Sequence, residues 1–151
     1  MMKFPGRAIA VAMAALLATT VPHAAQAQKA DAAKAPTFKF SKKVQPLLAD
    51  AQKKQQAGDA AGALAVLDQA DAVPDKNNDD AYMIAMLRLN SAIALKDNAL
   101  IEKSLEGALA TGRLSPEDEV KFRRNLGAMA LQRNDYPKAT SEFEKLLAKN
   151  P

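Results

Sequence analysis

The side chains of this sequence that could take part in chemistry are mainly carboxylates. Asp79 and Asp80 are adjacent, and Glu117, Asp118 and Glu119 form a run of three. Carboxylates placed in this way serve as general acids and bases, or as ligands of Ca²⁺. A calcium loop also needs a central glycine, which the segment DKNNDDAYM does not contain. Because both acidic groups stand where helices are expected to begin, we interpret them as groups that interact with the positive end of a helix dipole.

The residue types on which most enzymes and metal sites depend are scarce. The sequence has no Cys and no Trp, and its one histidine is His23. A thiol nucleophile, a thiolate ligand and a disulfide are therefore excluded. His23 lies in a segment that we expect to be removed, which leaves no general base that titrates near neutral pH. There is no glycine-rich phosphate-binding motif, and two Tyr and five Phe are too few for a base-stacking surface. We expect no catalysis, cofactor, metal ion or nucleic acid.

Residues 1–27 have the pattern of a secretory signal peptide. Lys3 and Arg7 precede the apolar run AIAVAMAALLATTV, and the small residues of the segment Ala-Gln-Ala end at Ala27. This run is shorter than the roughly 20 apolar residues that a membrane-spanning helix needs, so we favour cleavage after Ala27 over a membrane anchor. The mature protein is then expected to be periplasmic or secreted, without a stable membrane span.

Residues 28–40 are expected to form a flexible basic linker. The stretch QKADAAKAPT is polar and has no apolar periodicity. Seven lysines between Lys29 and Lys54 are accompanied only by Asp31 and Asp50. This excess of positive charge fits either an acidic partner or a simple solvated surface. We favour the solvated surface, because exposed lysines are common and easily screened.

Six helices are predicted after the linker, because apolar residues recur there at helical spacing between turn signals. They form three hairpins, with the ranges 41–57 and 60–72, 81–95 and 99–110, and 116–133 and 137–149. Gly58 is expected to end a helix in the left-handed conformation, Ser115 to cap the helix that starts at Pro116, and Asp79 or Asp80 to cap the third helix. Abundant Ala and Leu also favour an all-α fold.

An internal repeat links the three hairpins. Asp59, Asp97 and Asp135 follow one another at intervals of 38 residues, and each is expected to cap the second helix of its hairpin, for about 1 kcal/mol. The same offset aligns three columns of mostly apolar residues: Ala63, Ile101 and Ala139; Leu67, Leu105 and Phe143; Ala70, Ala108 and Leu146. These columns line one helix face, which a neighbouring hairpin would cover. We prefer stacked repeats to a chance bundle, because a bundle has no reason to keep this register.

The last hairpin resembles a tetratricopeptide repeat. That family's pattern of Leu-Gly, a turn with Tyr, a small Ala, an aromatic residue and a final Pro is matched by the following residues: Asn125, Leu126, Gly127, Asn134, Asp135, Tyr136, Ala139, Phe143 and Pro151. The resemblance extends more weakly over about residues 44–151, as repeats at about 44–78, 82–115 and 120–151. Leu89 replaces the small residue of the Leu-Gly pair, and the period exceeds the family's by four residues. The resemblance implies an all-α, right-handed superhelical solenoid of about three hairpins.

Tetratricopeptide arrays usually bind peptides or protein surfaces in a concave groove lined by the first helix of each hairpin. The resemblance therefore implies a non-catalytic scaffold or adaptor with a protein or peptide partner. In that register the groove-facing residues are the following: Gln45, Leu48, Gln52, Met83, Met86, Asn90, Lys121, Arg124 and Asn125. The two Met residues would supply adaptable apolar contacts or belong to the core. The cationic and amide groups would bind a carboxylate or peptide backbone, or form a solvated face. The carboxylate clamp of some family members is not expected, because Leu48 and Leu87 occupy positions where it needs polar groups.

A structural or assembly subunit is the alternative. The sequence stops at Pro151, where a further repeat would begin, and no polar capping helix follows. Repeat arrays need such a cap to cover the apolar face of their last hairpin. The chain is then expected to associate with itself or with further repeats through its last hairpin, and Leu126 and Leu147 are the residues whose substitution should abolish the association.

Overall fold

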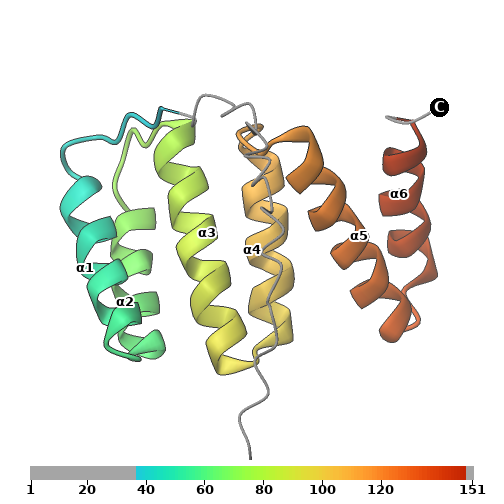
Figure 1. Cartoon of the computed structure of the whole chain (residues 1–151), viewed down its shortest axis with the longest axis horizontal. Coiled ribbons are helices and arrows are strands. Elements are labelled where there is room, and N and C mark those ends of the chain that lie inside the picture. Colours follow the sequence, from blue (N-terminus) through green and yellow to red (C-terminus); the bar gives the residue numbers. More distant parts are fainter. Residues whose placement is uncertain (1–36, 149–151) are drawn as a thin grey trace, which may run out of the picture. The chain divides into compact units, whose positions relative to one another are not determined.

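The computed structural model describes residues 37–148, which contain six α-helices and no strand (Figure 1). The helices are α1 (Gln45–Gln56), α2 (Ala60–Asp71), α3 (Asn78–Leu95), α4 (Asn98–Ala110), α5 (Pro116–Gln132) and α6 (Tyr136–Leu147). The predicted all-α class is therefore confirmed, and the helix ends differ from prediction by a few residues. The predicted signal peptide, most of the predicted linker and Pro151 lie outside the described residues.

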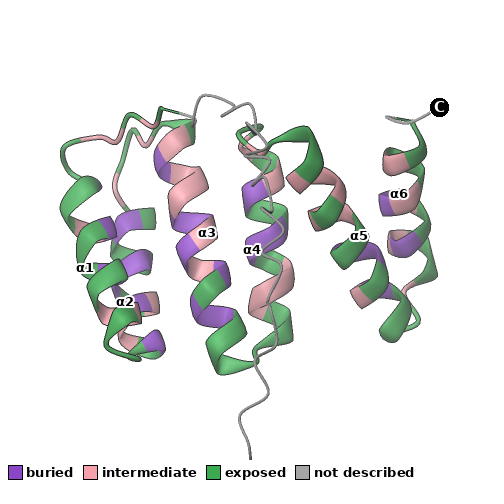
Figure 2. Ribbon diagram, viewed as in Figure 1, coloured by how far each residue is buried: buried purple, intermediate pink, exposed green. Residues whose placement is uncertain are grey.

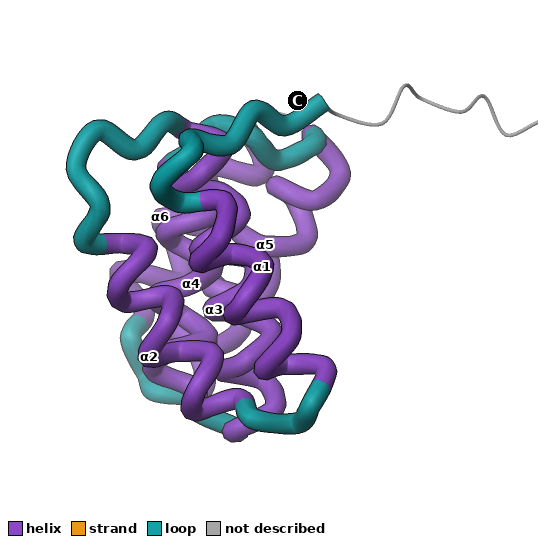
Figure 3. Tube along the Cα trace, turned by 90° about the vertical axis from the view of Figure 1, so that its left-hand side faces the viewer, coloured by secondary structure: helices purple, strands orange, loops and turns teal. Residues whose placement is uncertain are grey.

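Each helix packs against the helix that follows it in the sequence. Pairs α1–α2, α3–α4 and α5–α6 are hairpins, α2 contacts α3, and α4 contacts α5. Seen from the side of α1, the turns gather at the two ends of the helices (Figure 3). Helix α1 also contacts α3, whereas no Cα atom of α3 comes within 8 Å of one in α5. Within residues 37–148, two helix pairs therefore join the first hairpin to the second, and one pair joins the second to the third.

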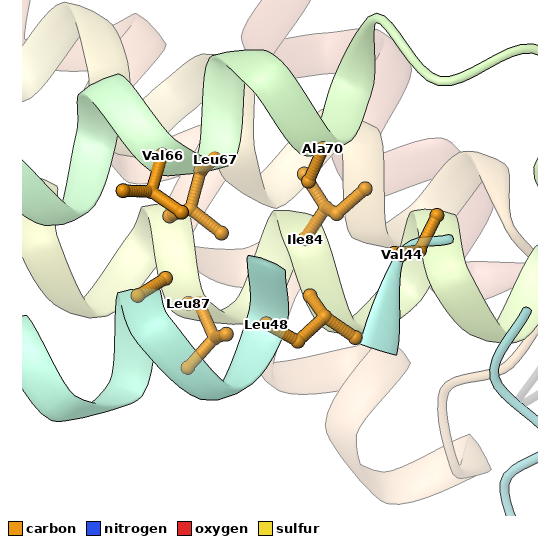
Figure 4. Packing of buried hydrophobic residues seen from close by; sticks show 8 residues of the cluster. Val44, Leu48, Val66, Leu67, Ala70, Ile84 and Leu87 are labelled. Atoms are coloured by element: carbon orange, nitrogen blue, oxygen red, sulfur yellow. The ribbon is translucent and has the colours of Figure 1, made fainter. Parts of the chain in front are cut away.

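The larger hydrophobic core lies between α1, α2 and α3 (Figure 4). Its buried residues are Val44, Leu48, Ala51, Val66, Leu67, Ala70, Ile84 and Leu87. Burying one Leu or Ile side chain contributes about 1.5–3 kcal/mol, so this cluster holds α3 firmly against the first hairpin.

A smaller core joins α3, α4 and α5. Its buried residues are Leu89, Leu105 and Leu126, and the partly buried residues packed against them are Ile101, Leu109, Phe122 and Met129. Much of α5 remains exposed (Figure 2). The third hairpin is therefore attached to the second through a smaller apolar contact than the one that joins the first hairpin to the second.

The predicted caps Asp59, Asp97 and Asp135 are confirmed. Their carboxylates accept hydrogen bonds from the backbone N–H groups three residues ahead, at 2.7, 2.9 and 3.2 Å. Gly58 adopts the predicted left-handed conformation, with φ of 77°, and Ser115 caps α5 by accepting from the amide of Asp118. Of the nine aligned column residues, six are buried, and three are half-buried, namely Ile101, Phe143 and Leu146. The 38-residue register is thus present in both capping and packing.

The N-cap of α3 is neither Asp79 nor Asp80, contrary to the prediction, although Asp80 takes part in the capping box of this helix. Asn77 is the N-cap, and its side-chain oxygen accepts from the amides of Asp79 and Asp80 at 2.8 and 2.9 Å. Asp80 is fully buried, and its carboxylate accepts from the amide of Asn77 at 3.1 Å, from the amide of Ser41 at 3.0 Å and from the Ser41 hydroxyl. Asp80 therefore fastens the segment before α1 to the start of α3.

That segment, residues 37–41, lies on the folded unit, although residues 37–40 were assigned to the flexible linker. The ring of Phe38 stacks on Tyr82 with 5.4 Å between centroids, and the Arg113 guanidinium lies 5.6 Å from the Phe38 centroid. Arg113 also pairs with Asp79 at 2.5 Å. Residues 37–41 have no regular secondary structure and form a strap on the folded unit, and α1 begins four residues later than predicted, with Pro46 in its first turn.

Candidate functional site

A groove lies between α3 and α5, with α4 as its floor. It encloses about 300 Å³. Its lining residues are Leu89 and Ile93 from α3, Ile101 and Leu105 from α4, and Phe122, Asn125, Ala128, Met129 and Gln132 from α5. We call this cavity the α3–α5 groove.

The groove exists because the backbones of α3 and α5 stand apart, with no Cα atom of α3 within 8 Å of one in α5. On α3, Leu89 and Ile93 are one helical turn apart, and on α5, Phe122 and Met129 are two turns apart, so each pair lies on one helix face. Leu89 is buried in the smaller core, but Ile93 is 55% exposed. The smaller core thus continues outward into an open apolar surface.

The lining residues carry no formal charge. Seven are apolar, and the other two are the amides Asn125 and Gln132. An amide side chain both donates and accepts hydrogen bonds, so it can satisfy the backbone of a bound segment. Apolar walls with a few polar groups are typical of binding sites. The groove can therefore bury apolar side chains and hydrogen-bond the chain that carries them.

Asn125 is the member of the predicted set of groove residues that lines this groove. Asn90 instead borders a separate cavity of about 220 Å³, beside Gln55 and Ser91. Gln52 and Gln45 are exposed on α1, and Met86 is half-buried on α3.

Two cationic members of the predicted set lie on α5, on its exposed side. Lys121 pairs with Glu117 at 2.8 Å and with Asp118 at 3.5 Å, and the hydrogen bond to Glu117 is the main reason that the pKa of Lys121 is raised. Arg124 forms no salt bridge with a residue of the described range. Arg124 therefore has its guanidinium available at the outer side of α5.

Two of the predicted groove residues belong to the core instead. Leu48 is buried, and Met83 packs against the same cluster. The placement of Leu48 was wrong because α1 turns that side toward α2 and α3. For Met83, the alternative that it is a core residue is the one that the packing favours.

Sequence reasoning missed most of the groove, above all Ile93, Phe122 and Met129. The spacing of Phe122, Asn125, Met129 and Gln132 does mark one face of α5. That signal was available, but an apolar face is equally consistent with burial under another helix. This face of α5 remains open because the backbones of α3 and α5 are separated.

Ion pairs also connect α4 to the third hairpin, at the turn after α5 and in the first turn of α6. Glu102 accepts from Arg133 Nη2 at 2.7 Å and from Lys138 Nζ at 2.5 Å, and it also pairs with Arg133 Nη1. Lys138 pairs with Glu106 as well. The hydrogen bond from Arg133, which outweighs the opposing effect of burial, and the bond from Lys138 lower the pKa of Glu102 to about 2.

A second ion-pair network lies within the third hairpin. Arg123 of α5 donates to Glu119 at 2.9 Å and to the buried Glu142 of α6 at 3.0 Å, and Lys145 donates to Glu142 at 2.5 Å. Burial by itself raises the pKa of Glu142, but the hydrogen bonds from Lys145 and Arg123 together lower it. These contacts hold α5 and α6 together as one body.

Within residues 37–148, no group of three or more His, Cys, Asp or Glu side chains is placed to hold a metal ion. No helix in the same range is long and apolar enough to cross a bilayer. Comparisons of the chain with protein-family models, with curated proteins and with solved structures give no match.

Proposed function

We propose that this protein is a non-catalytic scaffold that binds an apolar segment of a partner protein in the α3–α5 groove. The observation that carries the proposal is an open, uncharged groove in which Ile93 remains 55% exposed. Exposed apolar surface of this kind is costly to keep in water and commonly marks a binding site. The ligand supplies apolar side chains to the groove, each buried CH₂ contributing about 0.8 kcal/mol.

The scaffold is proposed to be a short right-handed solenoid of three tetratricopeptide-like repeats. Helix contacts confined largely to neighbours in sequence support a stacked array over a closed bundle. The equivalent caps at Asp59, Asp97 and Asp135 support a true repeat. In such an array α3 and α5 are equivalent first helices, so the groove between them lies on the face where we expect the ligand.

We propose that the scaffold is periplasmic or secreted. The support for this proposal is the signal-peptide pattern of residues 1–27. The partner is accordingly an exported protein or an exported segment of one.

A photo-crosslinking experiment tests the proposal. A photoreactive amino acid is placed at Ala128, on the groove, and as a control at Ala61, on the exposed side of α2. The crosslinked partner segment is identified by mass spectrometry, and its affinity for the purified chain is measured by calorimetry. We expect Ile93→Glu to weaken binding at least tenfold, and Leu95→Glu, at an exposed apolar position that does not line the groove, to leave it unchanged. Equal affinity of the Ile93→Glu variant and the wild type would exclude the groove as the site.

The second candidate function is that of an assembly subunit. It is favoured by exposed apolar side chains on the third hairpin, namely Leu131, Tyr136 and Leu147. Leu126, which was considered for the same role, is buried and therefore not available to a partner. Sedimentation over a range of concentrations distinguishes the functions: association that Leu147→Glu abolishes supports assembly, and a monomer at all concentrations supports the scaffold.

A further inference from the structure

We infer that the ion pairs at Glu102 hold the α3–α5 groove open by fixing the angle between the second and third hairpins. The biological use of this device rests on the function proposed for the groove. The device itself follows from three features of the region where the second and third hairpins meet, namely the single pair of helices with closely spaced backbones, the placement of the charges and the apolar walls of the groove.

The junction has the construction of a hinge. Of the described helices, α4 and α5 are the one pair from the second and third hairpins whose Cα atoms come within 8 Å of each other, whereas the first two hairpins meet in this way through both α2–α3 and α1–α3. The apolar contact between these two hairpins is the smaller core, in which Leu89 of α3 and Leu105 of α4 pack with Leu126 of α5. Two rigid bodies joined along one line can rotate about it, and other contacts must then set their angle.

The groove and the ion pairs occupy different sides of that line. On α4, Ile101 and Leu105 line the groove, while Glu102 and Glu106 bind the third hairpin. Each glutamate directly follows a groove residue, and consecutive residues of an α-helix differ by about 100° around its axis. Rotation of α5 and α6 toward the groove is therefore expected to change the distances between their cations and the glutamates.

The ion pairs are arranged to resist that rotation. Arg133 follows the last residue of α5 and donates to both oxygens of Glu102, while Lys138, in the first turn of α6, reaches Glu102 and Glu106. The side chain of Glu102 is 13% exposed, so water competes little for it. A bidentate Arg–carboxylate pair has a preferred geometry as well as attraction, so it constrains orientation.

An opposing force comes from the groove itself. Its walls are apolar, and closing them on one another would remove Ile93 and its neighbours from water. Two opposing effects thus set the width of the groove: burial of its apolar walls favours closure, and the ion pairs of α4 favour the open arrangement. Removing the ion pairs is expected to let the groove close.

Distances between spin labels test this inference without any partner protein. The chain has no Cys, so two introduced cysteines are the sole labelling sites. Ala94→Cys with Arg124→Cys measures across the groove from α3 to α5, and Ala61→Cys with Ala94→Cys is a reference pair from α2 to α3. All of these positions are exposed. Pulsed electron resonance gives the distance distribution of each pair in otherwise wild-type protein, in Glu102→Gln, in Lys138→Met, and in Glu144→Gln as a control for the loss of an exposed acid.

We expect the groove pair to shift to shorter distances in Glu102→Gln and in Lys138→Met, with the reference pair unchanged. Salt at molar concentration should produce part of the same shift in the wild type, because it screens the ion pairs. Circular dichroism checks that each variant is folded, and the salt titration remains informative if one is not. An unchanged or longer groove distance in the folded variants overturns the inference. Failure of Ile93→Glu to weaken partner binding would instead reject the proposed function and leave the distance result standing.

Discussion

The ring of Phe143 in α6 occupies the space in which a β-carbon on Gly127 of α5 would stand. A β-carbon built on Gly127 lies 2.6 Å from the ring Cζ and 2.7 Å from Cε1, far inside normal contact. Phe143 can pack this closely only because residue 127 has no side chain. The small residue of the Leu-Gly pair is therefore a packing requirement of the third hairpin.

Gly127→Ala should destabilise the protein by about 1–3 kcal/mol, because the added methyl group forces α5 and α6 apart. Gly107→Ala is the matched control. A β-carbon there would meet the Ala85 β-carbon at 3.6 Å, which is ordinary contact. Since Ala is the better helix former, the control should be neutral or more stable by up to about 1 kcal/mol. Urea unfolding followed by circular dichroism measures both, and equal effects of the two substitutions would refute the close-packing account.

Asp80→Ala should cost about 1–3 kcal/mol, because it removes the acceptor of the Ser41 and Asn77 amides in a buried position. The strap at residues 37–41 should loosen as well, which faster hydrogen exchange of the Ser41 amide would reveal. Asp50→Ala, at an exposed position on α1, is the control and should change stability by less than about 0.5 kcal/mol. Unchanged exchange at Ser41 in the Asp80 variant would contradict this role.

The stability contributed by Glu102 should disappear at low pH. Its folded pKa, about 2, lies below the ordinary value of 4.5, so the folded state favours the ionised form. The contribution is complete above about pH 4.5 and is lost as the pH falls through about 2. Because Arg133 is 45% exposed, solvent screening reduces the contribution to about 1 kcal/mol.

The measurement for Glu102 is the difference in unfolding free energy between the wild type and Glu102→Gln from pH 7 to pH 2. That difference should narrow below pH 4.5. The control variant Glu144→Gln should follow the wild type throughout. A difference that stays constant across this range would show that the ion pairs contribute no stability.

The three repeat caps should be energetically equivalent. Asp59→Ala, Asp97→Ala and Asp135→Ala are each expected to cost about 1 kcal/mol, because each leaves one helix-terminal N–H without its acceptor. Replacement by Asn, which retains a cap acceptor, should cost much less. Thermal unfolding of the six variants tests this equivalence. A negligible loss at one position would show that this hairpin does not depend on its cap.

Local patterns in the sequence were sufficient for the helices and much of their packing. The helix–turn–helix alternation, the caps Asp59, Asp97 and Asp135, and the left-handed Gly58 were all predicted, because each depends on residues close together in the chain. The N-cap of α3 was predicted wrongly: it is Asn77, while Asp80 completes the capping box and also accepts from Ser41, 39 residues away. That partner could not be inferred from the spacing around Asp80.

The sequence by itself determined the all-α class, the number of hairpins and the 38-residue register, since apolar period and capping chemistry act over one or two helical turns. Only the tertiary structure decided that α1 contacts α3 while the backbones of α3 and α5 stay apart, and hence that Ile93, Phe122 and Met129 line an open groove. The angle between two hairpins depends on the sum of many contacts between distant residues, including the ion pairs of Glu102. No local pattern encodes that sum, so the same apolar stripe can be a covered core face or an exposed binding surface.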